Sequence, residues 1–358
     1  WEVSDFIRKN RDILAGTTSA AEISVLHTSA SYYVHSGGLF TTQPGNKPVW
    51  GASRALQAGG HHFEIVSEHN LPRRIDDYRL VILAGQTHLP DETVARLESF
   101  VEGGGKLLAT GRSGFGDGDE SILAPLLGLE PHAETIQEGF SVEAQSRWLD
   151  GISRPDGASL CSLALDIPLL GVETVGASTV SGILVDGEGS PVRDTGWQWE
   201  GRGVREGGSR PFLTRHKYGS GQAWYVAADV FGHFDKTHYF GLRHLILNLV
   251  DRALPNPRVR ADARRPVEVS LRQKGTDTLI CHLVNINVGA TNPAMETQHE
   301  GRVSTGPVEV TIRLDRRPRS VRLARTGEEV QWQFEEGILS ANLPEVEVME
   351  SLVVGIGS

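Results

Sequence analysis

The feature that most constrains the fold is a regular alternation of short apolar segments with longer amphipathic segments. The runs AEISVLH, YRLVILAG and KLLAT have the length of strands, and LPDETVARLESFVEGGG, between the last two, has apolar residues at helical spacing. Strands joined by helices need right-handed crossovers and form a parallel sheet with helices on both faces. The alternation therefore predicts an α/β domain of flavodoxin-like type over residues 17–254.

This alternation is interrupted once and then ends. Between residues 138 and 210 glycine-rich strand segments such as VSGILVDGEGS replace the helices, which predicts a β-rich insertion. The proline- and arginine-rich segment PNPRVRADARRP indicates a linker over residues 255–266. Beyond it apolar and polar residues alternate, so residues 267–358 are predicted to form a small antiparallel β-sandwich.

The first residues have a different pattern. Apolar side chains recur at helical spacing from the first residue on, at Val3, Phe6, Ile7 and Leu14. Residues 1–16 are therefore predicted to be a linker helix that follows another domain upstream, and that domain is expected to bury the apolar face of the helix. A cytoplasmic location is expected for the protein.

Charge and composition limit the partners. The formal net charge of −10 provides no basic surface for nucleic acid and would repel an anionic membrane, and no apolar run approaches the length of a membrane helix. The two cysteines, Cys161 and Cys281, are far apart in the sequence, and Cys281 lies in the apolar run TLICHLVN, which favours a buried free thiol over a disulfide. Small neutral molecules or other proteins are the expected partners.

The candidate binding residues follow predicted strands. Loops after parallel strands converge at the carboxyl edge of the sheet, where ligands bind in such folds. Polar side chains there could bind a sugar hydroxyl, or they could cap helices and satisfy loop backbones. The candidates are His27, Gln86, Arg112, Ser113, Asp229 and His233.

Ser113 could also be a nucleophile. A nucleophile elbow has the pattern Gly-x-Ser-x-Gly, whereas this chain has Gly-Arg-Ser-Gly-Phe, with the last glycine displaced by one position. His233 or His238 could act as the base, but spacing alone does not align it with the hydroxyl. A serine in a turn or helix cap is the alternative.

Metal and cofactor motifs are not found in the sequence. The histidines have no HExxH or CxxC companion, and GDGDE is not followed by the further ligands of a calcium loop. The glycines of EGGGK end a helix before a strand, which is the reverse of a phosphate-binding loop. No metal and no cofactor are expected.

Three segments carry a resemblance to a known family. AEISVLHTSASYY, the stretch from EHNLPRRIDDYRLVILAGQ to GGGKLLATGRSG, and GSGQAWYVAADV together resemble the glutamine-amidotransferase-like domain called the β-galactosidase trimerisation domain, found in glycoside hydrolase family 42. In those proteins it follows a catalytic (β/α)8 barrel and precedes a small β-sandwich. True amidotransferases have a cysteine where this chain has Ser113, so glutamine hydrolysis is not implied.

The resemblance implies a role in assembly. The catalytic glutamates of family 42 lie in the barrel, so no catalytic residue is assigned here. The chain is expected to be the non-catalytic C-terminal portion of a glycoside hydrolase that forms a homo-oligomer, a trimer or else a dimer, and walls a carbohydrate site. A free-standing carbohydrate-binding or scaffold protein and a serine hydrolase using Ser113 are the alternatives.

Overall fold

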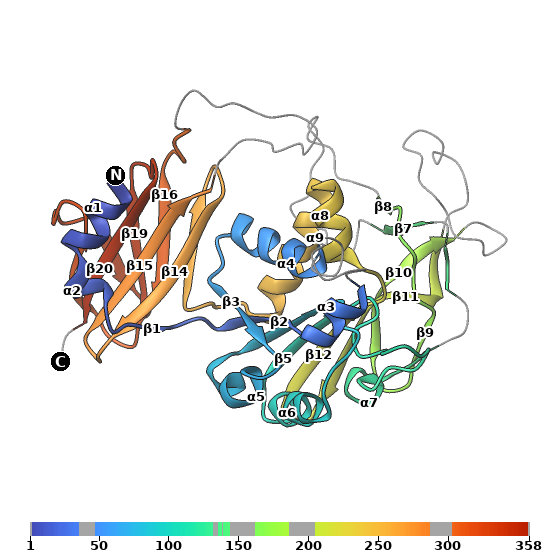
Figure 1. Ribbon diagram of the computed structural model, residues 1–358. Coiled ribbons are helices and arrows are strands. Elements are labelled where there is room, and N and C mark those ends of the chain that lie inside the picture. Colours follow the sequence, from blue (N-terminus) through green and yellow to red (C-terminus); the bar gives the residue numbers. More distant parts are fainter. Residues whose placement is uncertain are drawn as a thin grey trace. The chain divides into compact units, whose positions relative to one another are not determined.

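The computed structural model describes residues 2–35, 47–131, 135–137, 139–143, 162–185, 205–286 and 303–356 (Figure 1). The chain divides into two compact units. One, the α/β unit, comprises Ile23–Ala55 and Glu64–Pro255. The other, the β unit, comprises Trp1–Glu22, Leu56–Phe63 and Asn256–Ser358.

A nine-stranded mixed sheet forms the centre of the α/β unit. Strands β2, β4, β5 and β12 pair in parallel, and β12 continues through antiparallel pairs into β11, β10, β7 and β8. The order is β3 (Phe63–Ser67), β2 (Ile23–His27), β4 (Leu80–Ala84), β5 (Lys106–Thr110), β12 (Gly221–Val226), β11 (Arg205–Tyr218), β10 (Ser178–Val185), β7 (Phe140–Glu143) and β8 (Ser162–Leu165). The predicted β-rich insertion thus contributes strands to the same sheet.

Helices cover both faces of this sheet. Helices α6 and α7 lie on one face and α8 and α9 on the other (Figure 1). Every residue of β4 is buried as a result, which is typical of a strand covered on both sides. The helices are α3 (Ser29–His35), α4 (Lys47–Ala58), α5 (Leu71–Arg74), α6 (Asp91–Glu102), α7 (Ala124–Leu127), α8 (Val230–Thr237) and α9 (Phe240–Ala253), and β6 (Leu129–Pro131) pairs with β9 (Val172–Thr174).

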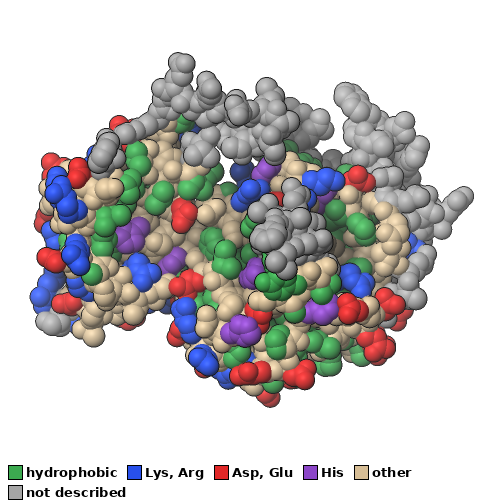
Figure 2. Space-filling view, viewed as in Figure 1, with side chains coloured by type: hydrophobic (Ala, Val, Ile, Leu, Met, Phe, Trp, Pro, Cys, Tyr) green, Lys and Arg blue, Asp and Glu red, His purple; other side chains and the backbone are tan. Residues whose placement is uncertain are grey.

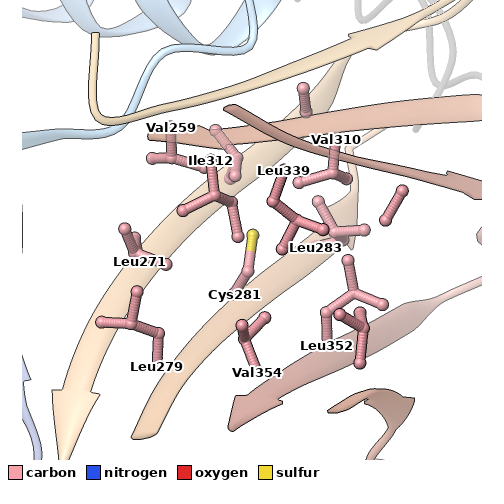
Figure 3. Close-up of a cluster of buried hydrophobic side chains, with 14 of the residues drawn as sticks. Val259, Leu271, Leu279, Cys281, Leu283, Val310, Ile312, Leu339, Leu352 and Val354 are labelled. Carbon is pink, nitrogen blue, oxygen red and sulfur yellow. The ribbon is translucent and has the colours of Figure 1, made fainter. Parts of the chain in front are cut away.

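The β unit contains two antiparallel sheets. Apolar side chains from both sheets fill the space between them (Figure 3). One sheet has the order β1 (Thr18–Ser19), β14 (Val267–Lys274), β15 (Thr278–Asn285), β20 (Met349–Ile356) and β17 (Pro318–Leu323); the other has β13 (Val259–Ala263), β16 (Val308–Arg313), β19 (Ile338–Leu343) and β18 (Trp332–Glu335). The expected combination of an α/β domain and a β-sandwich is observed.

Cys281 lies inside this sandwich, as predicted for a buried free thiol. Its sulfur points toward Ile312 and Leu339 of the facing sheet (Figure 3). Burial raises the pKa of the thiol to about 12, so the reactive thiolate is suppressed. Cys161 lies outside the described residues.

Two predicted boundaries are wrong. The expected linker over residues 255–266 contains strand β13, whose Val259 and Ala261 are buried and which pairs with β16. The α/β domain is predicted to begin at residue 17, but Thr18 and Ser19 pair with β14 of the sandwich. Strand β1 has only two residues, both polar, and β13 is short, contains Arg260 and Asp262 and lies among prolines and arginines, so pairing with distant partners reveals these strands.

The predicted linker helix over residues 1–16 is two short helices, α1 (Glu2–Lys9) and α2 (Arg11–Leu14). Phe6 is buried, whereas Val3 and Ile7 are 42% and 51% exposed. The helix therefore presents part of its apolar surface to solvent.

The surface is charged in both signs. On the face shown in Figure 2, acidic and basic side chains are interspersed and neither sign dominates a large area. Within the described ranges, the helices are too short or too polar for any of them to cross a lipid bilayer.

Candidate functional site

A cleft of about 530 Å³ lies in the α/β unit at the edge where the parallel strands end. Gly85, Gly111 and Ala228, which follow β4, β5 and β12, contribute to its lining. Gly111 has a φ of +55°, a left-handed conformation that favours glycine and turns the chain sharply after the strand. Backbone from three strands therefore forms one concave surface, at the edge where ligands bind in open α/β sheets.

Three of the six candidate residues meet in this cleft. Arg112 follows β5, Asp229 precedes α8 and His233 lies on α8, and all three line it. Lys47, Asp166 and Lys236 also line the cleft and were not predicted. Lys236 follows His233 by three residues, so the two side chains lie on the same face of α8, and this helical spacing could have identified Lys236 from the sequence. Lys47 and Asp166 have no such neighbour in the sequence.

Asp229 is the N-cap of α8. Its Oδ1 accepts a hydrogen bond of 2.9 Å from the Gly232 backbone N–H, which satisfies a free donor of the first helical turn. Burial raises the pKa of the Asp229 carboxyl most strongly and the Asp235 charge raises it further, while the Gly232 hydrogen bond opposes both. The result is a carboxyl that holds its proton to higher pH than usual.

The raised pKa gives a testable stability effect. The folded protein binds the Asp229 proton more tightly than the unfolded chain, so this group's contribution to stability falls as the pH rises above its ordinary pKa of 3.8. Asp229→Asn keeps the cap acceptor and removes the buried charge. We expect the variant to be more stable than the parent at pH 8 and the difference to vanish below about pH 3, where Asp229 is protonated in both states, measured by urea unfolding.

Asp229→Ala is the control for this variant. It loses the cap and should cost about 1 kcal/mol. An Asp229→Asn variant that is less stable than the parent at pH 8 would show that the ionised carboxylate is favoured in the fold.

His233 and Arg112 are positioned differently. Burial and the neighbouring Lys236 lower the pKa of His233, with Asp166 opposing them, so its imidazole stays neutral near pH 7. The Arg112 guanidinium donates to the Gly118 carbonyl and lies 5.2 Å from the centroid of the Phe115 ring. These contacts hold the guanidinium in place, with further donors left over.

Gln86 and His27 do not line the cleft. The Gln86 Oε1 accepts from the Thr28 backbone N–H at 2.7 Å, and its Nε2 donates to the Ala84 carbonyl at 2.9 Å. Gln86 therefore ties the loop after β2 to β4, which is the structural alternative considered above. The His27 ring packs 5.9 Å from that of Tyr32.

Ser113 lies away from the cleft lining and is fully buried. Its Oγ is 2.7 Å from the Thr110 carbonyl and 3.0 Å from the Leu83 carbonyl, so the hydroxyl proton is directed to backbone oxygen. This is the geometry of a turn serine, and a nucleophile would need a base in that place.

We expect Ser113 to resist a fluorophosphonate probe, because its hydroxyl is buried and bonded to backbone carbonyls. The measurement is mass spectrometry of the treated protein beside Ser113→Ala. Stoichiometric labelling that the substitution abolishes would establish an activated serine. Ser113→Ala should cost about 1 kcal/mol of stability, since one hydrogen bond is lost.

Another hydroxyl near the cleft contacts an imidazole. Thr87, which lines the cleft, has its Oγ1 2.8 Å from His88 Nδ1, and His88 Nε2 lies 3.2 Å from an Asp117 carboxylate oxygen. The Thr87 side chain is buried and Asp117 is highly exposed. The arrangement fixes the orientation of the His88 ring. Among the described residues, no group of three or more His, Cys, Asp and Glu side chains could hold a metal.

Comparison with known proteins gives the fold. No protein-family model matches the sequence, and no curated protein matches it. The chain is similar in structure to α-L-fucosidase isoenzyme 2 from Paenibacillus thiaminolyticus, with a TM-score of 0.73 and 17% identity over 98% of this chain and 51% of that one. A β-galactosidase from Bacillus circulans sp. alkalophilus matches with a TM-score of 0.63 and 19% identity over 99% and 44%.

A third similar structure is the GH42 β-galactosidase Gan42B from G. stearothermophilus. It has a TM-score of 0.60 and 18% identity, and the match covers 99% of this chain and 43% of that one. The chain thus spans about half or less of these three proteins. At these identities the likeness establishes a fold that occurs in glycoside hydrolases.

Proposed function

We propose that this chain is the non-catalytic C-terminal portion of a glycoside hydrolase, which supplies contacts between copies and the rim of a carbohydrate site. The observation that carries the proposal is the match of nearly the whole chain to about half or less of a fucosidase and two β-galactosidases. The α/β unit would then be a flavodoxin-like trimerisation domain, and the catalytic barrel would precede it.

The cleft supports the carbohydrate part of the proposal. Arg112, His233 and Asp229 combine hydrogen-bond donors and acceptors on one concave surface. Sugar hydroxyl groups both donate and accept hydrogen bonds, so a mixed set of this kind suits them.

The exposed part of α1 supports the assembly part. Val3 and Ile7 lie four residues apart on one face of the helix and are both exposed, whereas Phe6 on the same helix is buried. Contact with a second copy, or with an upstream barrel, would remove this apolar surface from water. A stable contact buries about 800 Å² on each partner.

Light scattering after gel filtration tests the assembly role. We expect a discrete oligomer at micromolar concentration, a trimer or else a dimer, and we expect the double variant Val3→Asp with Ile7→Asp to shift it toward monomer. Val175→Asp, at a side chain that is 63% exposed on the α/β unit, is the control. A monomeric parent protein that binds sugar would favour a free-standing carbohydrate-binding module instead.

One observation favours a second function, that of a glycosidase in its own right. Asp166 and Asp229 both line the cleft, and glycosidases act with a pair of carboxyl groups. The test is turnover of chromogenic β-galactosides and α-fucosides by this chain, for which we expect none. Turnover that both Asp166→Asn and Asp229→Asn abolish would contradict the non-catalytic proposal.

A further inference from the structure

The ionisable side chains of the cleft are unevenly balanced. Lys47, Lys236 and Arg112 are cations at neutral pH, whereas Asp166 and Asp229 are the carboxyl groups that line the same cleft. Within the part of the chain that the structure describes, neither Lys47 nor Lys236 has an ion-pair partner, although Arg54 of the neighbouring surface is paired with Asp235. The cleft therefore presents two ammonium groups that are not in an ion pair with a described residue, one from α4 and one from α8.

Its carboxyl groups offset these cations only in part. Asp229 has one oxygen engaged by the helix N–H of Gly232, and burial disfavours its ionised form. Asp166 is exposed, and water screens its charge. His233 is a neutral donor or acceptor beside them. A negatively charged ligand group would neutralise the ammonium groups more completely than the protein does.

The remaining lining is largely aliphatic. Pro48, Ile167, Pro168 and Leu170 form an apolar wall on the same cleft, and among the described residues that line it there is no Phe, Tyr or Trp on which a base could stack. The C–H face of a pyranose ring is a flat apolar surface that suits such a wall. A volume of about 530 Å³ lies within the range of small-molecule sites, which is about 300 to 1,000 Å³.

We propose that the cleft binds a saccharide that carries an oxyanion, with its anionic group between Lys47 and Lys236 and its ring against the Pro48 and Leu170 wall. This inference rests on the proposed function, in which the cleft is part of a carbohydrate site. Arg112 is held by Gly118 and Phe115 and donates its remaining N–H groups to ring hydroxyls or to the same anion. Carboxylate, phosphate and sulfate share this chemistry.

Calorimetric titration of the chain with glucuronate, glucose 6-phosphate, glucose and inorganic phosphate tests the inference. We expect at least one of the two anionic sugars to bind about tenfold more tightly than glucose, because each charged hydrogen bond adds about that factor. The arms with glucuronate and glucose 6-phosphate distinguish a carboxylate from a phosphate. Added salt should reduce the preference.

Two substitutions locate the binding. Lys47→Met and Lys236→Met should each weaken the anionic sugar about tenfold and leave glucose unchanged. Lys217→Met, at an exposed lysine of β11 outside the cleft, is the matched control and should change neither. Unchanged thermal midpoints of all three variants show that the fold is retained.

The alternative outcomes separate the two proposals. Equal binding of glucose and both anionic sugars overturns the oxyanion inference and leaves a carbohydrate site. Inorganic phosphate binding as tightly as glucose 6-phosphate overturns the saccharide part of the inference. Absence of binding in all four titrations overturns the inference together with the cleft's share of the proposed function, while the oligomer measurement still decides the assembly role.

Discussion

Gly51→Ala should destabilise the α/β unit by about 3 kcal/mol, although alanine is by far the better helix former. Gly51 lies within α4, and a Cβ atom placed on it would be 1.9 Å from the Phe231 carbonyl oxygen and 2.7 Å from its carbon. The obstacle is backbone of α8, which cannot turn aside as a side chain can. Either the two helices separate or the carbonyl moves out of its helix.

Gly118→Ala is the control for this substitution. Gly118 lies in the same unit with ordinary backbone angles, and a Cβ there would meet no atom closer than 4.0 Å. Urea unfolding of both variants beside the parent is the measurement. If Gly51→Ala instead raised stability by the roughly 1 kcal/mol that helix propensity provides, α4 and α8 would not approach each other as closely as described here.

This contact also matters for the cleft. Lys47 and Pro48 lie at the start of α4, and His233 and Lys236 lie on α8, so two helices that meet at Gly51 provide two walls of the site. Because Gly51 has no side chain at the crossing, α4 and α8 lie close together, which limits the distance between Lys47 and Lys236. We expect Gly51→Ala to weaken ligand binding as well as stability.

Much of the α/β unit could be predicted because its signals are local. The predicted helix LPDETVARLESFVEGGG corresponds to α6, and KLLAT corresponds to β5 over the same five residues. A proline before the helix, acidic residues in its first turn and glycines after it specify both ends without reference to the rest of the fold.

The prediction failed where strand formation depends on distant partners. Strand β13 buries Val259 and Ala261, but its neighbours are arginines and an aspartate, and prolines precede and follow it. Such a composition is typical of a linker. Only pairing with β16, some fifty residues later, makes this segment a strand.

The structure brings three of the six candidate residues, Arg112, Asp229 and His233, to one cleft. The rule for parallel sheets located the edge, which is a consequence of topology. Whether a side chain there faces the cleft depends on its local hydrogen bonds. Gln86 accepts a hydrogen bond from Thr28, and Ser113 donates to a backbone carbonyl. Asp166 reaches the cleft from a loop after β8, a strand whose place in the sheet is set by long-range pairing.

In the β unit, Leu339→Ala should cost about 3 kcal/mol. Leu339 is fully buried on β19, where it lies between Ile312 of β16 and Phe334 of β18 in the apolar layer of Figure 3. The substitution removes three buried carbon atoms and the free energy of burying them, and it leaves a cavity that the neighbouring strands cannot close.

Ile338 provides the matched control, because it precedes Leu339 on the same strand and is 44% exposed. Successive side chains of a strand point to opposite faces, so Ile338→Ala should change the stability by about 0.5 kcal/mol or less. Urea unfolding of the two variants measures the difference. A register shifted by one residue would exchange the buried and exposed faces of β19. If Ile338→Ala lost more stability than Leu339→Ala, β19 would pair with β16 one residue out of the register described here.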